Sequence, residues 1–532
     1  MFDVYLVHQA IDQGATLQPD REAIRFRGER LTYGALQTRA NQLARTLGDL
    51  GVARHDRVGI YLYKSVEMAV AIYGIMKAGA AFVPLDPLVP QERLNFMLQD
   101  CGIEVVISEP RKKREVAAAA GVTPLRAVIG LDEHGAPAAD AGLQIITWSA
   151  VAQQPDVQPP ITVMEQDLAY IMYTSGSTGQ PKGMMHTHRS SLGFARWGAR
   201  LYAMTPEDRV ASHAPLHFDL SVVDFFSTAL AGGTVVMVPE PVTKFPASFS
   251  QFIDDEQLTI IFTVPYALIQ LLLYGALEER NLGSLRWVLF GGEPYPTGHL
   301  RALMERLPWA RFSNVFGPAE TPACFNFEVP PLPAPTPDPL PIGRPSTNRD
   351  ILVVDEDDNP VPAGAPGELL VRGPSITPGY WQRPELNARA FLRVTLFDRF
   401  DLVYFRTGDL VQQLPDGSYR FIGRKDRMVK TRGYRVELDE VEAALVSHPA
   451  VEEAAVFAIP DGSGSNAVHA AVVLRDGFTT AICDLKAHLS GKLPRYAHPA
   501  DLTIRGSFPR TTSDKIDRHA LRQEALSPNP EL

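Results

Sequence analysis

A loop rich in hydroxyl groups and glycines follows an apolar segment near residue 174, in the run YIMYTSGSTGQPKG of residues 170–183. The apolar residues 169–173 predict a buried strand, and the glycines at 176, 179 and 183 allow positive φ and a close approach of the backbone to a ligand. Successive N–H groups in such a turn bind anionic oxygens, and the hydroxyl groups and Lys182 add further donors. We therefore predict a polyphosphate-binding loop whose spacing differs from the Walker pattern, with a flexible Gly/Ser-rich linker as the alternative.

Further motifs follow this loop in an order that is typical of one family of enzymes. The loop resembles the phosphate loop of the adenylate-forming (ANL) superfamily, which includes acyl-CoA synthetases, luciferases and the adenylation domains of peptide synthetases. The resemblance extends from about residue 10 to about residue 525. It implies an α/β fold in which a large N-terminal domain of doubly wound sheets, with a β-barrel-like subdomain, is hinged to a small α+β C-terminal domain. ATP and Mg²⁺ are the implied nucleotide and metal.

Two segments resemble the parts of this family that bind the nucleotide. In NVFGPAET (residues 314–321) the resemblance implies that Phe316 lies against adenine and that Glu320 binds magnesium, for which one carboxylate beside phosphate oxygens suffices. In YFRTGDL (residues 404–410) it implies that Asp409 accepts from both ribose hydroxyls, with help from Arg424. Plain turns with a solvated acidic residue are the alternatives. The implied nucleotide-binding set is Thr174, Ser175, Gly176, Ser177, Thr178, Gly179, Lys182, Phe316, Gly317, Glu320, Thr321, Asp409 and Arg424.

A lysine near the C-terminus is the implied catalytic cation. The segment PRTTSDKIDR (residues 509–518) resembles the family segment with the catalytic lysine, here Lys515. When a carboxylate attacks the α-phosphate of ATP, negative charges converge, and a cation held there stabilises the transition state. The resemblance also implies catalytic roles for Thr174 and Glu320. The chain departs from the family pattern at two positions, with Ala319 in place of threonine and Asp514 in place of glycine. An adenylate-binding relative that has lost activity is therefore the alternative to an active enzyme.

The segment HFDLSVVD (residues 217–224) predicts the class of acid that is activated. In the amino-acid-activating branch of the family, an aspartate at the position of Asp219 pairs with the substrate's ammonium group. A carboxylate among apolar residues needs such a partner, because burying an unpaired charge is costly; a helix cap is the alternative. The other implied pocket residues are uncharged, which predicts a small or medium apolar amino acid, and the chain looks similar to stand-alone ligases that load proline or β-amino acids onto carrier proteins. These residues are Leu220, Val223, Phe262, Leu289, Gly291, Val315, Ala323 and Cys324.

A charged turn divides the chain into two predicted domains, residues 1–423 and 424–532. The segment GRKDRMVKTRGY (residues 423–434) resembles the family's hinge, with Asp426 and Arg427 at its centre. In the family the small domain rotates there, so that one orientation forms the adenylate and the other admits a thiol, and domain rotation is a known gating device. We expect the partner to be a separate carrier protein with a 4′-phosphopantetheine thiol. CoA, in an acyl-CoA ligase of the same fold, is the alternative acceptor.

The elements that must position these residues are strands that alternate with helices along the chain. Short apolar runs separated by helical stretches predict βαβ units and parallel sheet. A hairpin is predicted at residues 22–33 and a helix at 33–47. Further strands are predicted at residues 57–62, 80–85, 104–108, 233–239, 258–264 and 287–290, followed by a proline-rich connection at 329–345. Residues 350–373 predict antiparallel or barrel-like structure, and residues 452–459, 468–474 and 501–504 predict the strands of the small domain.

Composition excludes several other classes of protein. A chain of 532 residues exceeds the usual size of one hydrophobic core and predicts more than one domain. The formal net charge of −10 offers no basic face to nucleic acid. The apolar stretch 66–85 contains charged residues and a glycine, which predicts a buried helix and strand and not a membrane span. Three distant cysteines and an N-terminus without a basic leader predict a cytoplasmic protein that lacks disulfides and a structural zinc site.

Overall fold

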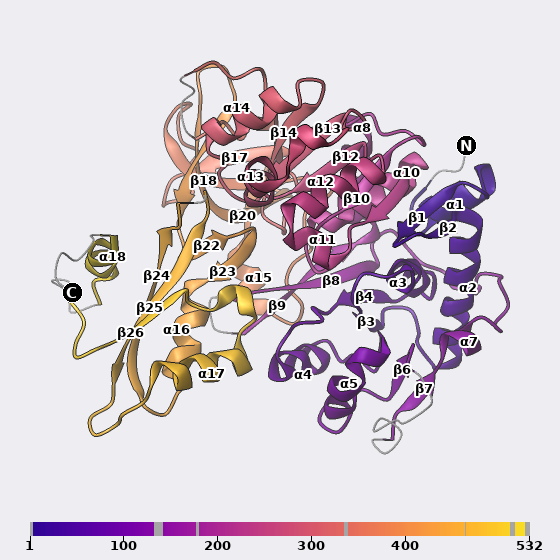
Figure 1. Ribbon diagram of the computed structural model, residues 1–532, viewed down its shortest axis with the longest axis horizontal. Helices are drawn as coiled ribbons and strands as arrows, with labels where there is room; N and C mark the ends of the chain where they lie inside the picture. The colour runs from indigo at the N-terminus through magenta and orange to yellow at the C-terminus, as the bar shows by residue number, and fades with distance from the viewer. Residues whose placement is uncertain are drawn as a thin grey trace. The chain divides into compact units, whose positions relative to one another are not determined.

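The computed structural model describes residues 4–131, 142–176, 180–334, 339–462, 464–510 and 516–526. The chain divides into two compact units (Figure 1). The first unit comprises Met1–Pro87, Met97–Tyr173 and Gly183–Lys425, and the second comprises Leu88–Phe96, Thr174–Lys182 and Asp426–Leu532. Two short segments of the N-terminal part, 88–96 and 174–182, therefore group with the C-terminal residues. Among the described helices, none has both the length and the apolar character that crossing a bilayer requires.

A seven-stranded sheet belongs mainly to the first unit. Its strands are β3 (Arg57–Tyr61), β4 (Ala81–Pro84), β5 (Val105–Ser108), β6 (Ala127–Ile129), β7 (Gln144–Ile146), β8 (Leu168–Thr174) and β9 (Lys182–Thr187). They lie in the order β7-β6-β5-β3-β4-β8-β9, and the pairs from β7 to β8 are parallel, as the alternation of strands and helices predicts. The helical segments of this region are α3 (Val66–Lys77), α4 (Gln91–Asp100), η1 (Pro110–Lys112), α5 (Lys113–Ala120) and α7 (Trp148–Val151). The apolar stretch 66–85 is therefore a buried helix followed by a buried strand, as predicted.

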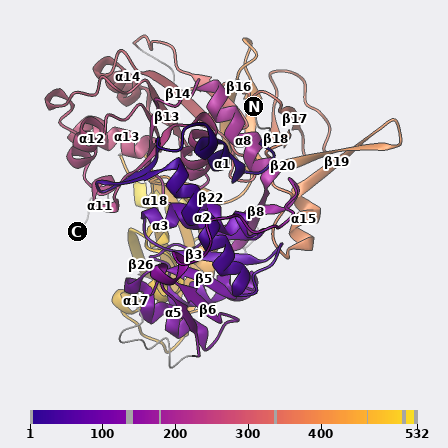
Figure 2. The same cartoon turned by 90° about the vertical axis from the view of Figure 1, so that its right-hand side faces the viewer.

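A nine-stranded sheet is the second large sheet of this unit. Its strands are β1 (Glu22–Phe26), β2 (Glu29–Thr32), β10 (Arg209–Ser212), β11 (Thr234–Met237), β12 (Ile260–Thr263), β13 (Trp287–Gly291), β14 (Arg311–Phe316), β15 (Phe325–Glu328) and β16 (Arg344–Pro345). The order is β16-β15-β14-β13-β12-β10-β11-β1-β2, with six parallel inner strands and antiparallel edges at β2, β15 and β16. The predicted hairpin is β1 and β2, and the helix predicted after it is α2 (Tyr33–Asp49), which packs beside α3 (Figure 2).

The two faces of the nine-stranded sheet pack into different hydrophobic clusters, because successive side chains of a strand point to opposite faces. Ile261 and Val288 face a cluster that includes α12 (Pro246–Asp255), α13 (Pro265–Tyr274) and α14 (Thr297–Arg306). Ile260 and Leu289 face a larger cluster that includes α2, α3, α8 (His188–Leu201) and the seven-stranded sheet. Helices on both faces make the sheet doubly wound, as predicted. The remaining helical segments here are α1 (Gln9–Leu17), α11 (Glu240–Lys244) and η3 (Leu277–Glu279).

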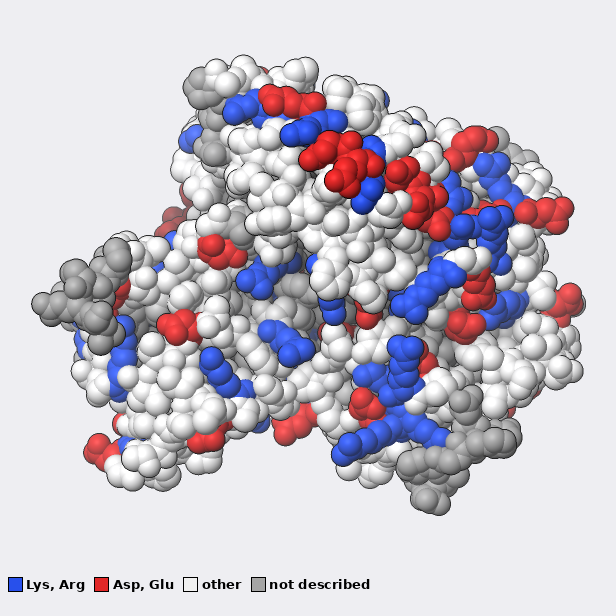
Figure 3. Space-filling model, viewed as in Figure 1, with Lys and Arg blue, Asp and Glu red and all other residues white. Residues whose placement is uncertain are grey.

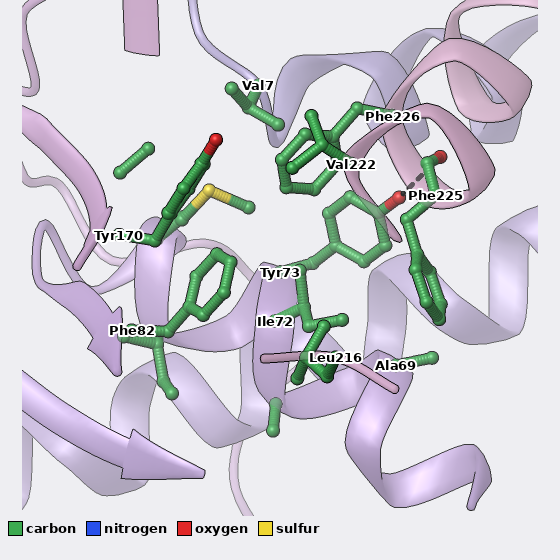
Figure 4. Close-up of a cluster of buried hydrophobic side chains, with 14 of the residues drawn as sticks. Val7, Ala69, Ile72, Tyr73, Phe82, Tyr170, Leu216, Val222, Phe225 and Phe226 are labelled. Carbon is green, nitrogen blue, oxygen red and sulfur yellow. Dashed lines mark hydrogen bonds between the residues drawn. The ribbon is translucent and has the colours of Figure 1, made fainter. Parts of the chain in front are cut away.

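Aromatic rings hold the larger cluster together (Figure 4). The ring centroids of Phe82 and Tyr170 lie 5.2 Å apart, and both rings lie within 6.5 Å of Phe226. Phe226 belongs to one helical run, built from α9 (Leu220–Val222), the π-helical turn η2 (Val223–Ser227) and α10 (Thr228–Ala231). The Tyr73 hydroxyl donates to the carbonyl oxygen of Phe225 at 3.2 Å and so satisfies a buried acceptor in that turn. Single π turns are rare and are found frequently at functional sites.

A five-stranded antiparallel sheet corresponds to the predicted barrel-like subdomain. Its strands are β17 (Asp350–Val354), β18 (Pro366–Arg372), β19 (Phe391–Leu396), β20 (Phe400–Gln413) and β21 (Tyr419–Arg424). The order is β17-β18-β20-β19, and β21 also pairs with β20. Helix α15 (Pro384–Ala390) precedes β19. The length of β20 was not predicted, since only the motif at its centre, residues 404–410, stands out in the sequence.

The C-terminal residues of the second unit form a small α+β domain, as predicted. A three-stranded sheet has the order β24-β25-β26, with β24 (Val451–Pro460), β25 (Asn466–Leu474) and β26 (Asp501–Arg505). A ribbon of β22 (Met428–Thr431) and β23 (Tyr434–Glu437) accompanies it, with α16 (Leu438–Val446), α17 (Ile482–Lys492), η4 (Arg495–Ala497) and α18 (Arg518–Leu526). Within this unit, Arg93 of α4 forms a buried ion pair with Glu440 of α16.

Candidate active site

The predicted polyphosphate loop lies between β8 and β9, so its two flanks are strands. Gly176 and Gly183 do not adopt the positive φ that glycine allows, and the close approach to a ligand that we predicted beside it stays a prediction. Nearby protein atoms exclude a side chain at both positions: a Cβ at position 176 would lie 2.1 Å from the carbonyl oxygen of Gln180, and one at position 183 would lie 2.9 Å from the Ile171 side chain. The backbone at Gly176 therefore doubles back so tightly that no side chain fits.

The described hydroxyl groups of the loop differ in their partners. Ser175 is buried, and its Oγ donates to the carbonyl oxygen of Arg435 at 3.2 Å within the second unit. The Oγ1 of Thr174 is buried and has no hydrogen-bond partner among the described residues. Lys182 begins β9. The other predicted loop residues, Ser177, Thr178 and Gly179, lie outside the described residues.

The two residues predicted to bind ribose are neighbours in the first unit. Asp409 on β20 and Arg424 on β21 are register partners across the antiparallel pair. Nη1 of Arg424 donates to Oδ1 of Asp409 at 2.6 Å, and both side chains are at least nine-tenths buried. The backbone N–H of Asp409 donates to Oγ1 of Thr407 at 3.1 Å, which fixes the strand at that point. The aspartate is thus held by a charge-assisted hydrogen bond, which is stronger than a neutral one.

The predicted adenine-stacking residue lies against the same strand pair. Phe316 ends β14, and its ring centroid lies 5.8 Å from that of Phe421 on β21. The Cys324 thiol donates to the carbonyl oxygen of Phe316 at 3.5 Å. Burial, reinforced by the nearby Asp409 charge, raises the pKa of this thiol to about 12. The structure therefore brings Phe316, Cys324 and Asp409 together.

Glu320, the predicted magnesium ligand, is only 1% exposed. The Tyr380 hydroxyl donates to its Oε1 at 2.7 Å, and Tyr380 is itself held by Asn387 of α15, whose Oδ1 accepts from the Tyr380 backbone N–H at 2.7 Å. Among the described residues no cluster of three or more His, Cys, Asp or Glu side chains is suited to hold a metal ion. A magnesium ion at Glu320 would therefore depend on phosphate oxygens and water for its other ligands, which is common for Mg²⁺. The single carboxylate of Glu320 therefore suits Mg²⁺ when phosphate oxygens and water supply the other ligands.

Two aromatic residues connect Glu320 with Asp219. The rings of His186 and Tyr170 stack with centroids 4.8 Å apart. Burial lowers the pKa of His186 to about 4, and the nearby Glu320 charge opposes this shift. Burial raises the pKa of the Tyr170 hydroxyl well above its usual value, and the charge of Asp219 raises it further. The charges of Glu320 and Asp219 thus act on the two rings of one stacked pair.

Asp219 stands at the position before α9, but its side chain makes no capping hydrogen bond to that helix. The helix-cap alternative from the sequence is therefore not realised. The side chain of Ser221 instead stabilises the turn, since its Oγ donates to the carbonyl oxygens of Leu216 at 3.1 Å and Phe218 at 2.6 Å.

Most of the predicted pocket residues belong to one hydrophobic cluster. Phe262 and Leu289 are register partners on β12 and β13, and Gly291 and Val315 are register partners on β13 and β14. Phe262, Leu289 and Val315 lie in the larger cluster with Val223 and Ala323, and Leu220 packs against it. Cys324 does not join them, because it lies in a separate cluster beside the five-stranded sheet.

Backbone geometry is unusual at two pocket positions and in the adenine motif. A Cβ on Gly291 would lie 2.3 Å from the carbonyl oxygen of Val315, so only glycine fits there. Ala323 has φ of 47°, a left-handed conformation that is strained for a residue with a side chain. A Cβ on Gly317 would lie 2.8 Å from the carbonyl oxygen of Thr321, so the chain turns back on itself at this point.

The predicted hinge residues lie at the division of the two units. Lys425, the last residue of the first unit, is anchored there by its ammonium group, which donates to Oε2 of Glu368 at 3.1 Å. Arg427 is anchored in the second unit by two hydrogen bonds to Glu442, at 2.9 and 2.8 Å, and by an ion pair with Asp439. Asp426 stands between these two anchored side chains, and its Oδ1 accepts from the backbone N–H of Met428.

Lys515, the predicted catalytic lysine, lies outside the described residues. The described residues on either side are well held, because Arg510 and Ile516 form an antiparallel bridge. Arg518 makes two hydrogen bonds to Glu442, at 2.8 and 2.9 Å. Glu442 thus binds Arg518 and the hinge residue Arg427 at once.

Sequence reasoning missed several residues of the site. Tyr380 and His186 contact the residues around Glu320, yet neither lies in a recognised motif. Tyr170 was predicted only as part of a buried strand, although the Asp219 charge acts on its hydroxyl. The spacing of the sequence contains no signal for these interactions, since they join separate elements. On the face shown in Figure 3, acidic and basic side chains are both present.

Comparison with known proteins agrees with this geometry. Residues 11–381 match the family model of the AMP-binding enzymes, and residues 440–515 match the model of their C-terminal domain. An L-proline–[L-prolyl-carrier protein] ligase from Pseudomonas fluorescens is 34% identical over 520 residues, which cover 98% of this chain and 99% of that protein. Tyrocidine synthase 1 from Brevibacillus parabrevis is 33% identical over 98% of this chain, which spans 45% of that protein. The solved structure of the amide bond synthetase McbA from Marinactinospora thermotolerans aligns with a TM-score of 0.84 at 25% identity, covering 98% of this chain and 99% of that one.

The chain belongs to the family of AMP-binding enzymes. The resemblance to adenylate-forming enzymes, the α/β fold with its smaller C-terminal domain, and the class of AMP-forming ligase are thereby confirmed. ATP is the nucleotide that membership of this family implies.

Proposed function

We propose that this protein activates an amino acid with ATP as an aminoacyl-AMP and then transfers the aminoacyl group to the phosphopantetheine thiol of a separate carrier protein. The observation that carries this proposal is Asp219, a carboxylate whose charge acts on the buried Tyr170 hydroxyl and which does not cap the helix after it. A carboxylate at an apolar pocket favours a cationic partner, and the ammonium group of an amino acid supplies one. The carrier-protein acceptor is supported by the match over nearly the full length of a prolyl-carrier protein ligase.

The pocket residues support a small or medium apolar side chain on the substrate. Phe262, Leu289 and Val315 present aliphatic and aromatic surface from neighbouring strands, and each is at most 6% exposed. An extra or missing methylene in such a pocket changes binding by only about 1–3 kcal/mol, so these residues support a class of substrate, with proline and β-amino acids as the first candidates.

In this proposal the nucleoside and the phosphates are bound by different groups. Asp409, steadied by Arg424, accepts from the ribose hydroxyls, and Phe316 lies against adenine. Thr174, with the loop that follows it, donates to phosphate oxygens, and its buried Oγ1 has no hydrogen-bond partner in the part of the chain that the structure describes. Glu320 would hold Mg²⁺, and the ion when bound would neutralise phosphate charge. Tyr380 keeps the Glu320 carboxylate oriented through its hydrogen bond at 2.7 Å.

Lys515 is the proposed cation between the attacking carboxylate and the α-phosphate. A preorganised donor of this kind contributes about 10²–10³ in rate. Asp426 is the proposed hinge, because it separates a residue anchored in the first unit from a residue anchored in the second. Rotation about it would let the same protein catalyse adenylation and thioester formation in turn.

Pyrophosphate exchange with matched substrate pairs tests the proposal. Wild-type protein is assayed with proline and other apolar α- and β-amino acids, and with the corresponding des-amino acids. We expect exchange with at least one amino acid and none with its des-amino analogue. The Asp219→Ala variant should lose most of this preference while it still binds ATP. Exchange supported equally by both members of a pair would favour an acyl-CoA ligase, and the absence of exchange with every acid would contradict adenylation.

A further inference from the structure

A buried lysine outside the proposed binding residues contacts the base of the segment that bears Asp219. Lys64 follows β3 and is 8% exposed. Its ammonium group donates to the carbonyl oxygens of Ser212 at 2.6 Å and His213 at 2.8 Å, at the end of β10. It also approaches the carbonyl oxygen of Val238, just past β11, at 3.3 Å. One cation from the seven-stranded sheet therefore binds the carboxyl ends of two strands of the nine-stranded sheet.

The carbonyl oxygens that Lys64 binds are only a few residues from Asp219. The chain runs from His213 directly into the turn whose far end is fixed by the Ser221 hydroxyl. The segment 212–221 is thus held at its start by Lys64 and at its end by Ser221. A shift at the start of so short a segment moves the Asp219 carboxylate directly.

An unpartnered carboxylate accompanies this lysine. Asp224 in the π turn η2 is completely buried, and neither of its carboxylate oxygens has a hydrogen-bond partner among the described residues. Burial raises the pKa of Asp224 well above its usual range, and the neighbouring Lys64 ammonium group opposes this shift. Burial lowers the pKa of Lys64 to about 8, and the charges of Asp224 and of Glu240 on α11 oppose that shift. Burial also lowers the pKa values of His213 and His217, and the Lys64 charge lowers both further. Lys64 and Asp224 therefore stabilise each other's charged forms against the cost of burial.

We propose that Lys64, supported by Asp224, is a positioning residue that sets the place of the Asp219 carboxylate and thereby the affinity for the amino acid. The proposal rests on the function proposed above, since it concerns the substrate group that Asp219 binds. Lys64 acts through the backbone of the segment 212–221 and does not itself touch the substrate. A displacement of about 1 Å in such a group is enough to cost up to 10²-fold in rate.

The test compares KM values for the amino acid and for ATP in pyrophosphate exchange. Lys64→Met should raise the KM for the amino acid at least tenfold, leave the KM for ATP within twofold, and weaken the discrimination against the des-amino acid. Lys77→Met is the matched control, because Lys77 is also a buried lysine, at 0% exposed, but pairs with Asp12 on α1 and with Gln158 before β8. It should lower the melting temperature without changing the ratio of the two KM values.

A second variant keeps the proposal testable if Lys64→Met does not fold. Asp224→Asn removes the charge that favours the ammonium form of Lys64 and preserves the shape of the side chain. The rise in amino-acid KM with increasing pH should therefore begin at a lower pH in Asp224→Asn than in the wild type. The proposal is overturned if Lys64→Met folds and its KM for the amino acid stays within twofold of wild type. If Lys64→Met does not fold, an unchanged pH profile of the amino-acid KM in Asp224→Asn overturns it. If the wild-type protein shows no amino-acid-dependent pyrophosphate exchange, the proposed function itself is refuted.

Discussion

The carboxylate of Asp409 and the guanidinium group of Arg424 meet across β20 and β21 with an N–O distance of 2.6 Å, and both are nearly excluded from solvent. They are separated by fifteen positions in sequence, yet the hairpin register makes them direct partners. A buried pair of this kind is vulnerable, because removing one member leaves the other charge uncompensated.

Asp409→Asn should therefore weaken ATP binding and lower stability together. We expect the KM for ATP to rise at least tenfold and the free energy of unfolding to fall by about 3 kcal/mol, because the Arg424 charge would lose its counter-charge. Glu328→Gln is the control: it breaks the Arg311–Glu328 pair, whose side chains are 58% and 51% exposed, and such surface pairs contribute about 0–1 kcal/mol. Urea unfolding and ATP titration measure both effects, and equal losses in the two variants would argue against a binding role for Asp409.

Lys515→Ala should abolish adenylate formation with little effect on ATP binding. The expected loss in exchange rate is about 10²–10³, since the variant lacks the cation that we propose between the carboxylate and the α-phosphate. Lys492→Ala provides the control on the same domain, because Lys492 is a partly exposed lysine near Glu92. A fluorescent ATP analogue measures nucleotide affinity. Normal turnover in Lys515→Ala would refute the assigned role.

Asp426→Pro should separate the two half-reactions. Proline fixes φ near −65° and restricts rotation at the residue between the anchored Lys425 and Arg427. We expect pyrophosphate exchange within about threefold of wild type, or thioester formation at a comparable level, but not both. Asp426→Ala should retain both activities. If Asp426→Pro supports both half-reactions at wild-type rates, the hinge lies elsewhere.

Stability should fall in weak acid because of His188. Its Nδ1 accepts a hydrogen bond from the backbone N–H of Val7 at 3.2 Å, and burial lowers its pKa from 6.5 to about 4. Between these two values the unfolded chain binds a proton that the folded chain does not, so stability declines as the pH falls from 6.5 toward 4, by up to about 1.4 kcal/mol per pH unit. His188→Asn, which keeps an acceptor near Nδ1 but does not titrate, should flatten this part of the curve measured by thermal unfolding. An identical slope would contradict the assignment.

The sequence predicted strands and motifs well, and contacts between distant elements poorly. Apolar runs and turn residues identify β3, β4, β5 and β12 because these strands are buried on both faces and their composition follows burial. Gly176 was predicted to allow positive φ and a close approach to a ligand; it has no positive φ, and the nearby carbonyl oxygen of Gln180 excludes a side chain there, a contact that the sequence alone does not reveal. Tyr380 could not be connected with Glu320, since sixty residues separate them and only the packing of α15 brings the hydroxyl into place.

The carbonyl oxygen of Val315 occupies the space where a side chain at position 291 would begin. This part of the proposed pocket wall is therefore peptide backbone, whose position depends on the hydrogen bonds of the sheet and not on any replaceable side chain. Randomising position 291 should therefore not enlarge the proposed pocket for bulkier acids. The adjustable walls of the proposed pocket are Phe262 and Leu289 on neighbouring strands, where a smaller residue should make room for a bulkier acid.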